Sequence, residues 1–175
     1  MKPHLFLTSI IAASGILSAC SPSTPAQADF TVTTKPSEEC LHDEKTFRCV
    51  KVLKNYDGDT ITVNIPNVPP LIGKNISVRV FGIDTPEVKT KNQCEKEAGR
   101  IAKNLVSATL KNAKTVELHN VRRDKYFRIL ADVKVDGRSL KDILLKNKLA
   151  YEYDGGTKKR LDWCKVVRLP ANSGR

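Results

Sequence analysis

Residues 47–65 read FRCVKVLKNYDGDTITVNI. Both halves of this stretch, residues 47–55 and 60–65, contain β-branched residues and alternate between apolar and polar side chains. Such alternation is typical of strands that bury one face. The dipeptide Asp57-Gly58 between the halves favours a tight turn. The stretch therefore predicts a β-hairpin near the start of a folded domain.

Three more strands are predicted further along the chain. Residues 66–73 contain three prolines and a glycine, which predicts a loop. The strand pattern resumes over residues 76–83, where Val78 and Val80 share one face and Arg79 points to the other. Residues 115–121 and 129–135 have the composition of two further strands.

Helices are predicted between and after these strands. Apolar residues recur at helical spacing over residues 98–109. Ser139 is a predicted N-cap of a second helix, and a short third helix is expected over residues 157–166. Five strands with interspersed helices predict a small α+β domain built on a β-barrel.

The chain is strongly basic. It has 175 residues and a formal net charge of +11, from 30 Lys and Arg against 19 Asp and Glu. This excess favours a polyanionic partner such as nucleic acid. A basic surface that serves solubility, or attraction to anionic lipid, is the alternative interpretation.

The first residues are typical of an export signal. Lys2 precedes an apolar stretch over residues 5–17, which is short for a membrane span. It ends in Leu-Ser-Ala-Cys, which resembles a bacterial lipoprotein signal with Cys20 as the lipidated first residue. Ordinary secretion with cleavage after Ala28 is the alternative. Either interpretation predicts a location in the cell envelope, lipid-anchored in the membrane or secreted, on its periplasmic or extracellular face.

These features divide the chain into four expected parts. Residues 1–19 form the lipoprotein signal peptide, and residues 20–39, rich in Ser, Pro and Ala, form a flexible tether. Residues 40–166 form the folded domain, and residues 167–175 form a disordered tail.

Four cysteines remain after Cys20. An even number in an oxidising compartment is typical of disulfides. Three pairings are possible, and we favour Cys40–Cys49 together with Cys94–Cys164. A zinc site is the rival interpretation, and the irregular spacing argues against it.

Two acidic clusters adjoin the predicted strands, Asp57-Gly58-Asp59-Thr60 and Asp84-Thr85-Pro86-Glu87. Taken alone, the first is compatible with a simple turn and the second with a solvated strand end. Carboxylates are, however, suitable ligands for Ca²⁺ or Mg²⁺, and the nearby Arg79 suits a phosphate. Arg79 and Asp84 would lie on opposite faces of a regular strand, so a bend at Gly82 is needed to bring them together.

A third cluster is basic. Residues 122–128, RRDKYFR, interleave four cations with two aromatic rings, which suits phosphate contact and base stacking. A solvated basic hairpin loop has the same composition.

The three clusters, in this order, resemble those of the staphylococcal nuclease (thermonuclease) family, in its exported bacterial lipoprotein-type branch. The resemblance covers about residues 50–164 and rests on residues 57–61, 79–87 and 124–128. It implies a five-stranded OB-fold β-barrel with three short helices. It also implies a monomeric, Ca²⁺-dependent, sugar-nonspecific nuclease that hydrolyses DNA and RNA and leaves 3′-phosphate ends, with no protein partner.

The resemblance also implies a role for each acidic residue. Asp59 and Asp84 would be carboxylate ligands of one Ca²⁺ ion, to which Thr85 would contribute its backbone carbonyl. Glu87 would orient or deprotonate the attacking water. A carboxylate in that position provides general-base catalysis.

Cationic and aromatic residues are implied to bind the substrate. Arg79 and Arg128 would clamp the scissile phosphate and neutralise the charge that builds on its oxygens. Further substrate contacts are implied for Lys125, Tyr126, Tyr151 and Tyr153.

The chain departs from the family pattern in the insert at residues 66–70 and in Phe127, which replaces a glycine. The alternative function is a catalytically silent, nucleic-acid-binding envelope lipoprotein. Inactive members of the fold usually lack one of the acids or arginines, and this chain has all of them.

Overall fold

The computed structural model describes residues 40–124 and 128–167. The signal peptide, the tether, Cys20 and all but the first residue of the expected tail lie outside these ranges. The strands are β1 (Lys51–Asn55), β2 (Thr60–Asn64), β3 (Ile76–Val80), β4 (Ile83–Asp84), β5 (Val116–Arg123), β6 (Ile129–Val135), β7 (Arg138–Ser139) and β8 (Tyr151–Glu152). The helices are α1 (Pro70–Gly73), α2 (Gln93–Lys111), α3 (Leu140–Lys146) and α4 (Trp163–Val167).

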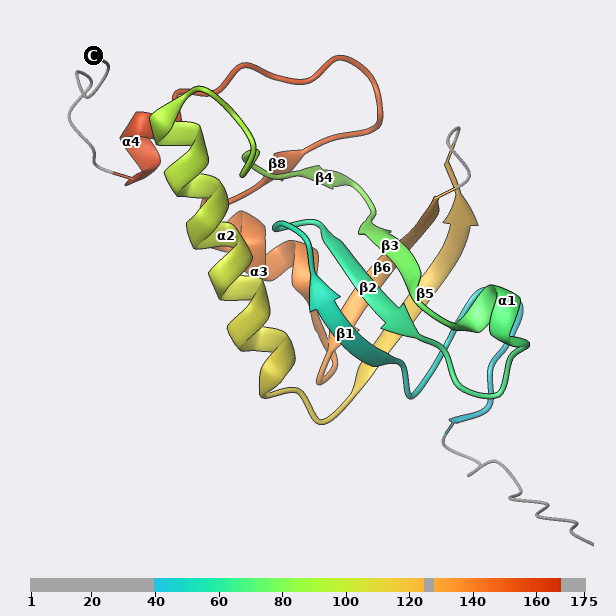
Figure 1. Ribbon diagram of the computed structural model, residues 1–175. Helices are drawn as coiled ribbons and strands as arrows, with labels where there is room; N and C mark the ends of the chain where they lie inside the picture. Colours follow the sequence, from blue (N-terminus) through green and yellow to red (C-terminus); the bar gives the residue numbers. More distant parts are fainter. Residues whose placement is uncertain (1–39, 125–127, 168–175) are drawn as a thin grey trace, which may run out of the picture. The chain divides into compact units, whose positions relative to one another are not determined.

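The five longer strands form one curled sheet in the order β1-β2-β3-β6-β5 (Figure 1). All neighbours are antiparallel except β3 and β6, which are parallel. The chain just before β1 pairs with β5 on the far edge, where Phe47 and Leu118 exchange backbone hydrogen bonds of 2.8 and 2.9 Å. The two edges of the sheet are thereby joined, and the predicted β-barrel of five strands is confirmed.

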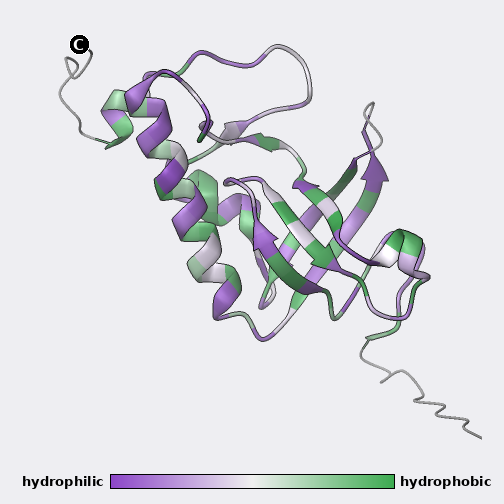
Figure 2. Cartoon of the chain, in the orientation of Figure 1, coloured by the Kyte–Doolittle hydropathy of each residue, from purple (hydrophilic) through white to green (hydrophobic). Residues whose placement is uncertain are grey.

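The core follows from the alternation in the sequence. Ile61 and Val63 of β2 are completely buried, as is Val78 of β3, while the intervening residues are partly exposed. The inward residues of α2 and α3 pack into the same core and are also fully buried: Ala102, Val106, Leu140 and Leu144. Figure 2 shows the polar residues of α2 on its outer side. Burying an aliphatic side chain contributes about 1.5–3 kcal/mol, so this continuous core is the main stabilising element.

All three predicted helices are present, but two of them differ in length from the prediction. The helix expected over residues 98–109 is the longer α2, because Asn92 caps it upstream by accepting a hydrogen bond of 3.0 Å from the Glu95 backbone N–H. Ser139 caps α3 as predicted. The third helix is shorter than expected, since only Trp163–Val167 is helical, and α4 ends one residue beyond the expected domain boundary.

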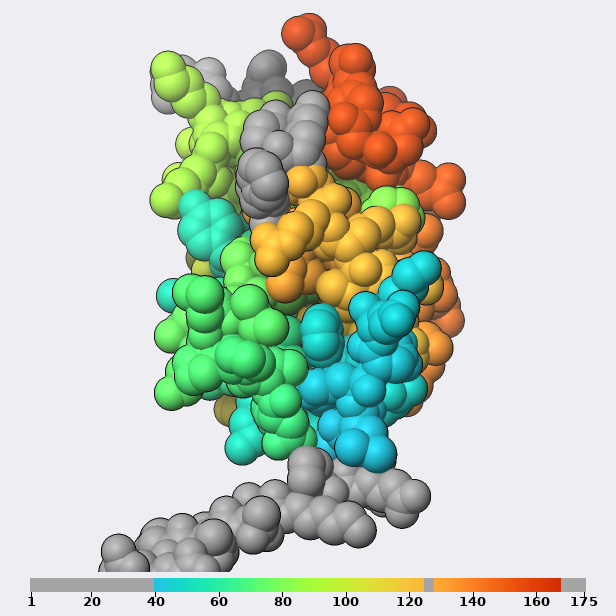
Figure 3. All heavy atoms as spheres, turned by 90° about the vertical axis from the view of Figure 1, so that its right-hand side faces the viewer, coloured from blue at the N-terminus to red at the C-terminus, as the bar shows by residue number. Residues whose placement is uncertain are grey.

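A fourth helix lies where a loop was predicted. The prolines of residues 66–70 precede or open α1, where Pro70 takes the first helical position and its missing N–H is not needed. On the face shown in Figure 3, the start of the described chain lies beside this region and beside β5. There His42 Nε2 lies 2.6 Å from the Pro66 carbonyl oxygen. Within the described residues, no helix has the length and apolar character needed to cross a membrane.

Both predicted disulfides are confirmed. Cys40–Cys49 closes a short loop before β1, and Cys94–Cys164 joins the first turn of α2 to α4. Trp163 is buried beside the second bridge, against Ala98 of α2. Residues 153–162 form an irregular stretch directly after β8, which we call the C-terminal segment. The bridge fixes the far end of this segment.

Candidate functional site

The neighbouring strands β2 and β3 bring Asp59 and Arg79 together. Thr60 of β2 lies opposite Arg79 of β3, so Asp59, just before β2, lies beside the arginine. The Val80 N–H donates to the Asp59 carbonyl oxygen at 2.8 Å and holds this corner of the sheet. The position of Asp59 is thus set by the backbone ladder.

Gly82 brings Asp84 to the same side. It has a φ of +80°, a backbone conformation that residues with a Cβ adopt only with strain, and it separates β3 from β4. The Tyr153 N–H donates to the Gly82 carbonyl oxygen at 3.0 Å, next to the pairing of β4 with β8. The predicted bend at Gly82 is confirmed.

The Arg79 guanidinium bridges the two aspartates. Its Nη1 lies 2.8 Å from Asp59 Oδ1 and its Nη2 lies 2.6 Å from Asp84 Oδ1. Burial disfavours the charged arginine, but the two carboxylates outweigh it and raise the pKa of Arg79. Three charged groups are therefore held in fixed positions at the end of the barrel.

Asp59 is the most buried of these groups, with only 1% of its surface exposed. Its Oδ2 accepts a hydrogen bond of 3.1 Å from the Thr85 backbone N–H, and its Oδ1 accepts one from the Thr60 hydroxyl at 3.1 Å. Burial raises the pKa of the Asp59 carboxyl to about 7, although Arg79 opposes the rise. A second positive charge at this site would favour the ionised form.

Asp84 connects the barrel to the C-terminal segment. Its Oδ2 accepts a hydrogen bond of 2.7 Å from the Tyr151 hydroxyl, and its Oδ1 lies 3.1 Å from Lys158 Nζ. The same ammonium group lies 2.8 Å from Glu87 Oε1. Burial and the bond to Asp84 raise the pKa of Tyr151. Burial lowers the pKa of Lys158, but Glu87 and Asp84 outweigh this and raise it overall.

The loop that carries Glu87 is held by the start of α2. Glu95 Oε2 accepts a hydrogen bond of 2.8 Å from the Thr90 hydroxyl, and Glu95 Oε1 accepts a longer one of 3.5 Å from the Glu87 backbone N–H. The Glu87 carboxylate itself is half exposed. It can therefore reach solvent while its backbone stays anchored.

Arg128 lies in a neighbouring cavity of about 300 Å³, which we call the arginine cavity because Arg79 lines it too. The Nε of Arg128 donates to Asp124 Oδ2 at 2.8 Å, and the Arg128 backbone N–H donates to Asp124 Oδ1 at 2.9 Å. Tyr153 also lines this cavity. The structure thus brings both predicted arginines and one of the two predicted tyrosines together. Lys125 and Tyr126 lie outside the described residues.

A second cavity of about 390 Å³, which we call the carboxylate cavity, lies beside the first. Its lining includes most of the residues that were predicted to bind the metal or to act on the attacking water, together with one tyrosine: Asp84, Thr85, Glu87 and Tyr151. Tyr151 therefore faces the carboxylates, whereas Tyr153 faces the arginines. Asp59 adjoins the carboxylate cavity through its bond to Thr85.

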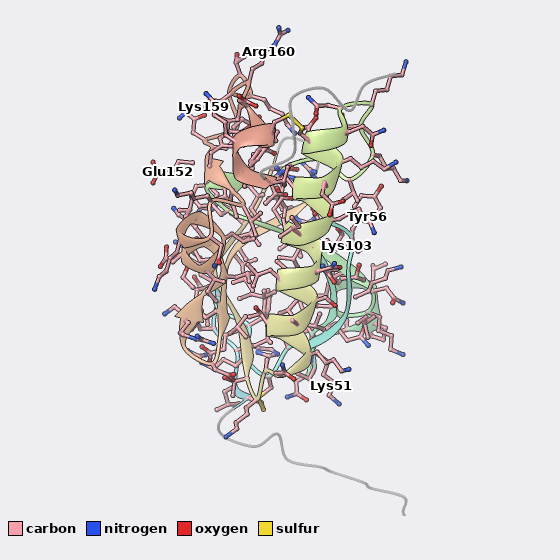
Figure 4. The ribbon with its side chains drawn as sticks, turned by 90° about the vertical axis from the view of Figure 1, so that its left-hand side faces the viewer. Lys51, Tyr56, Lys103, Glu152, Lys159 and Arg160 are labelled. Atoms are coloured by element: carbon pink, nitrogen blue, oxygen red, sulfur yellow. A yellow bond between two sulfur atoms is a disulfide. The ribbon has the colours of Figure 1, made fainter. Side chains whose placement is uncertain are left out.

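Sequence reasoning missed Lys158, which also lines the carboxylate cavity. The available signal was the basic run Lys158-Lys159-Arg160, but the residues before it have no period that would give the direction of a side chain. Figure 4 shows Lys159 and Arg160 projecting from the outer part of the C-terminal segment. Only Lys158 of the three has an ion pair with the carboxylates among the described residues.

The donor set fits a hard divalent cation. Two aspartates, a backbone carbonyl and water provide the oxygen ligands that Ca²⁺ prefers. Within the described residues, no group of three or more His, Cys, Asp or Glu side chains has metal-binding geometry. The aspartates instead face two cationic side chains, Arg79 and Lys158, which shows that this pair of carboxylates attracts positive charge.

Comparison with known proteins agrees with this geometry. The family model described as staphylococcal nuclease homologue matches residues 77–164. The chain is 42% identical over 122 residues to Endonuclease YncB of Bacillus subtilis (strain 168), covering 66% of this chain and 54% of that protein. It is 40% identical over 108 residues to the SPbeta prophage-derived endonuclease YokF of the same organism, covering 58% of this chain and 34% of the relative.

A third relative is the Thermonuclease of Staphylococcus hyicus, which is 31% identical over 109 residues, or 62% of this chain and 59% of the relative. The chain thus spans less than two thirds of the length of each of these curated relatives. The family match covers half of the chain, including Arg79, Asp84, Glu87 and Arg128. This protein belongs to the staphylococcal nuclease homologue family.

Proposed function

We propose that this protein is a Ca²⁺-dependent, sugar-nonspecific nuclease that hydrolyses phosphodiester bonds in DNA and RNA and leaves 3′-phosphate ends. The observation that carries the proposal is the placement of Arg79, which contacts both buried aspartates and also lines the cavity that contains Arg128. A metal-type carboxylate pair and two guanidinium groups thus share one small region. The names of the relatives, two endonucleases and a thermonuclease, point to the same class of reaction.

Asp59, Asp84 and the Thr85 carbonyl would hold one Ca²⁺ ion. When bound, this ion supplies positive charge that offsets the charge developing on the phosphate oxygens. The protein residues prepare its site: the Thr60 hydroxyl and the Thr85 N–H fix the Asp59 carboxylate, and the Tyr151 hydroxyl fixes Asp84.

Glu87 would orient and deprotonate the attacking water. Its carboxylate is half exposed in a loop anchored to Glu95, so it can accept a proton from water. Water would attack phosphorus in line with the P–O5′ bond, and that bond would break to leave a 3′-phosphate. Arg79 and Arg128 would each bind the phosphate oxygens through two N–H groups, an interaction that strengthens as charge builds in the transition state.

A metal-dependence assay tests the activity. We expect the purified full-length protein to degrade single-stranded DNA and RNA in Ca²⁺ at mildly alkaline pH, and EDTA to abolish cleavage. End-labelled products should carry 3′-phosphates. Failure to cleave in Ca²⁺ would contradict the proposal. Nucleic-acid binding that persists in EDTA, together with no cleavage in Ca²⁺, would support the silent binding protein instead.

Glu87→Gln tests the role of the general base. We expect the cleavage rate to fall about 10²–10⁴-fold, because an amide cannot take the proton from water. Glu97→Gln is the matched control, since Glu97 is an exposed residue of α2 that pairs with Arg100. Full activity of Glu87→Gln would refute the assignment of this residue while leaving the nuclease activity itself intact.

We also propose that Cys20 is lipidated and anchors the protein in the cell envelope. The proposal rests on the Leu-Ser-Ala-Cys motif at residues 17–20. Incorporation of labelled palmitate that is lost in Cys20→Ser would support it. Release of the unlabelled protein cut after Ala28 would support ordinary secretion.

A further inference from the structure

Lys158 lies where positive charge is needed. Its ammonium nitrogen is 3.1 Å from Asp84 Oδ1 and 2.8 Å from Glu87 Oε1. Asp84 is 3% exposed, and the third acidic neighbour, Asp59, is 1% exposed. Three carboxylates close together repel one another. Within the described residues, the cations that pair with them are Arg79, on Asp59 and Asp84, and Lys158, on Asp84 and Glu87.

The two cations are held in different ways. Arg79 belongs to β3 and is fixed on both sides by neighbouring strands. Lys158 belongs to the irregular C-terminal segment, and about half of its side chain is exposed to solvent. An exposed lysine on a flexible four-carbon chain can leave a site at little energetic cost. Lys158 is therefore the cation that can be exchanged.

We propose that Lys158 is a tethered counter-ion, a positioning residue that replaces the divalent cation in the metal-free protein and competes with it for Asp84 and Glu87. The inference rests on the proposed function, since it takes Asp84 as a ligand of the metal. Lys158 bridges the Asp84 and Glu87 carboxylates and offsets their repulsion until the divalent cation binds. When a divalent cation takes these ligands, the ammonium group leaves the carboxylates and moves out toward solvent.

This competition weakens the affinity for the metal and stabilises the protein that lacks it. Removing the ammonium group leaves the carboxylates with one balancing cation fewer, so a divalent ion binds more tightly. The same change leaves Asp84 less well compensated when no metal is bound. Loss of the ammonium group should therefore raise the affinity for the metal and lower the stability of the metal-free protein. A simple surface ion pair would not produce this combination.

The test compares Lys158→Met with Lys159→Met in the full-length protein. Both variants lose one positive charge from the lining of the carboxylate cavity, but Lys159 has no ion pair with a carboxylate among the described residues. Ca²⁺ affinity is measured by isothermal titration calorimetry. We expect Lys158→Met to bind Ca²⁺ about tenfold more tightly than the wild type and Lys159→Met to change less than threefold, because the interaction between charges decreases with distance.

Thermal unfolding gives an independent measurement. In EDTA, Lys158→Met should unfold at a lower temperature than the wild type and Lys159→Met, and in saturating Ca²⁺ this difference should vanish. Lys158→Arg keeps the charge and should resemble the wild type in both conditions.

The outcomes separate this inference from the proposed function. Equal Ca²⁺ affinity for the wild type and Lys158→Met, or an unfolding difference that persists in Ca²⁺, overturns the counter-ion role and leaves the nuclease intact. Absence of Ca²⁺ binding by every variant overturns the metal site and the counter-ion role together.

Discussion

The two walls of the carboxylate cavity differ in how they are built. One wall belongs to the barrel: Asp84 lines the cavity there, and Asp59 and Arg79 lie directly behind it. Paired strands position all three residues, and the two aspartates are buried. The other wall is the C-terminal segment, which carries the exposed Lys158 and is fixed at its ends by β8 and by Cys94–Cys164. The first wall is held by many backbone hydrogen bonds, and the second by a few attachments.

This difference separates two requirements of the site. Groups that must keep their distances during a reaction belong on rigid elements, since small displacements reduce the rate strongly. A group that must leave when another cation arrives belongs on an irregular segment with few contacts. Changes in the barrel wall should therefore affect chemistry and stability together, whereas changes in the segment should affect mainly metal binding and local stability.

The largest effect is expected for Arg79→Met in the barrel wall. Loss of the guanidinium leaves two buried carboxylates without their shared partner, which destabilises the metal-free protein by about 3 kcal/mol. It also removes a donor to the transition state, so the cleavage rate should fall about 10³-fold. Urea unfolding and initial rates measure the two effects. The exposed Arg100→Met on α2 is the control and should change neither; a stable, active Arg79→Met would break the contrast between the walls.

The attachment of the second wall is tested by the two disulfides. The variant Cys94→Ser/Cys164→Ser opens a loop with a sequence separation of 70, against 9 for Cys40→Ser/Cys49→Ser. Loop-closure entropy predicts that the first variant loses about 2 kcal/mol more than the second. Urea unfolding followed by the fluorescence of Trp163 measures the difference. Equal losses would contradict the expectation from loop-closure entropy that the longer bridge stabilises the protein more.

Gly82→Ala tests the bend that connects Arg79 to Asp84. A Cβ at a φ of +80° costs about 1–2 kcal/mol, and relief of the strain would move Asp84 away from Arg79. Gly137→Ala is a matched control, because its φ is +76° and the new Cβ meets no atom within 4 Å. We expect similar losses of stability, with cleavage reduced about tenfold in Gly82→Ala alone. Equal activity of the two variants would show that the bend is not needed.

The last expected effect is a dependence of the stability on pH, which comes from the buried Asp59. Burial raises the pKa of Asp59 from 3.8 to about 7, so the folded metal-free protein binds this proton more tightly than the unfolded chain does. The resulting stability is fully present below pH 3.8 and is lost as the pH rises to about 7. Bound Ca²⁺ requires the ionised carboxylate, so stabilisation by Ca²⁺ should grow over the same range.

Unfolding temperatures in EDTA and in Ca²⁺ measure this dependence, with Asp59→Asn as the control that lacks the titrating group. A stability in EDTA that rises between pH 4 and 7 because of Asp59 would contradict the raised pKa.

The sequence predicted the barrel wall well for a physical reason. Alternation fixes which face of a strand is buried, and short turns such as Asp57-Gly58 leave few ways to pair the strands. The need for a bend at Gly82 followed from counting residues between Arg79 and Asp84. Family motifs then supplied roles for residues that periodicity alone would have left as turns.

The second wall could not be predicted in the same way. The C-terminal segment has two adjacent glycines and no apolar period, so nothing local determines where Lys158 points. Its position depends on attachments that are distant in the sequence, namely the pairing of β8 with β4 and the bridge to α2. The short α1 was missed because the prolines that usually interrupt structure here open a helix.

The bridge between Cys94 and Cys164 also means that a cut in the chain need not release a fragment. The exposed run Lys158-Lys159-Arg160 is a natural target for a trypsin-like protease, and cleavage there would cut the segment between β8 and α4. The detached piece would stay covalently bound to α2 through the bridge, with Trp163 still able to pack against Ala98. In denaturing electrophoresis, the cleaved protein would run as a single species without a reducing agent. After reduction of the disulfide it would run as two.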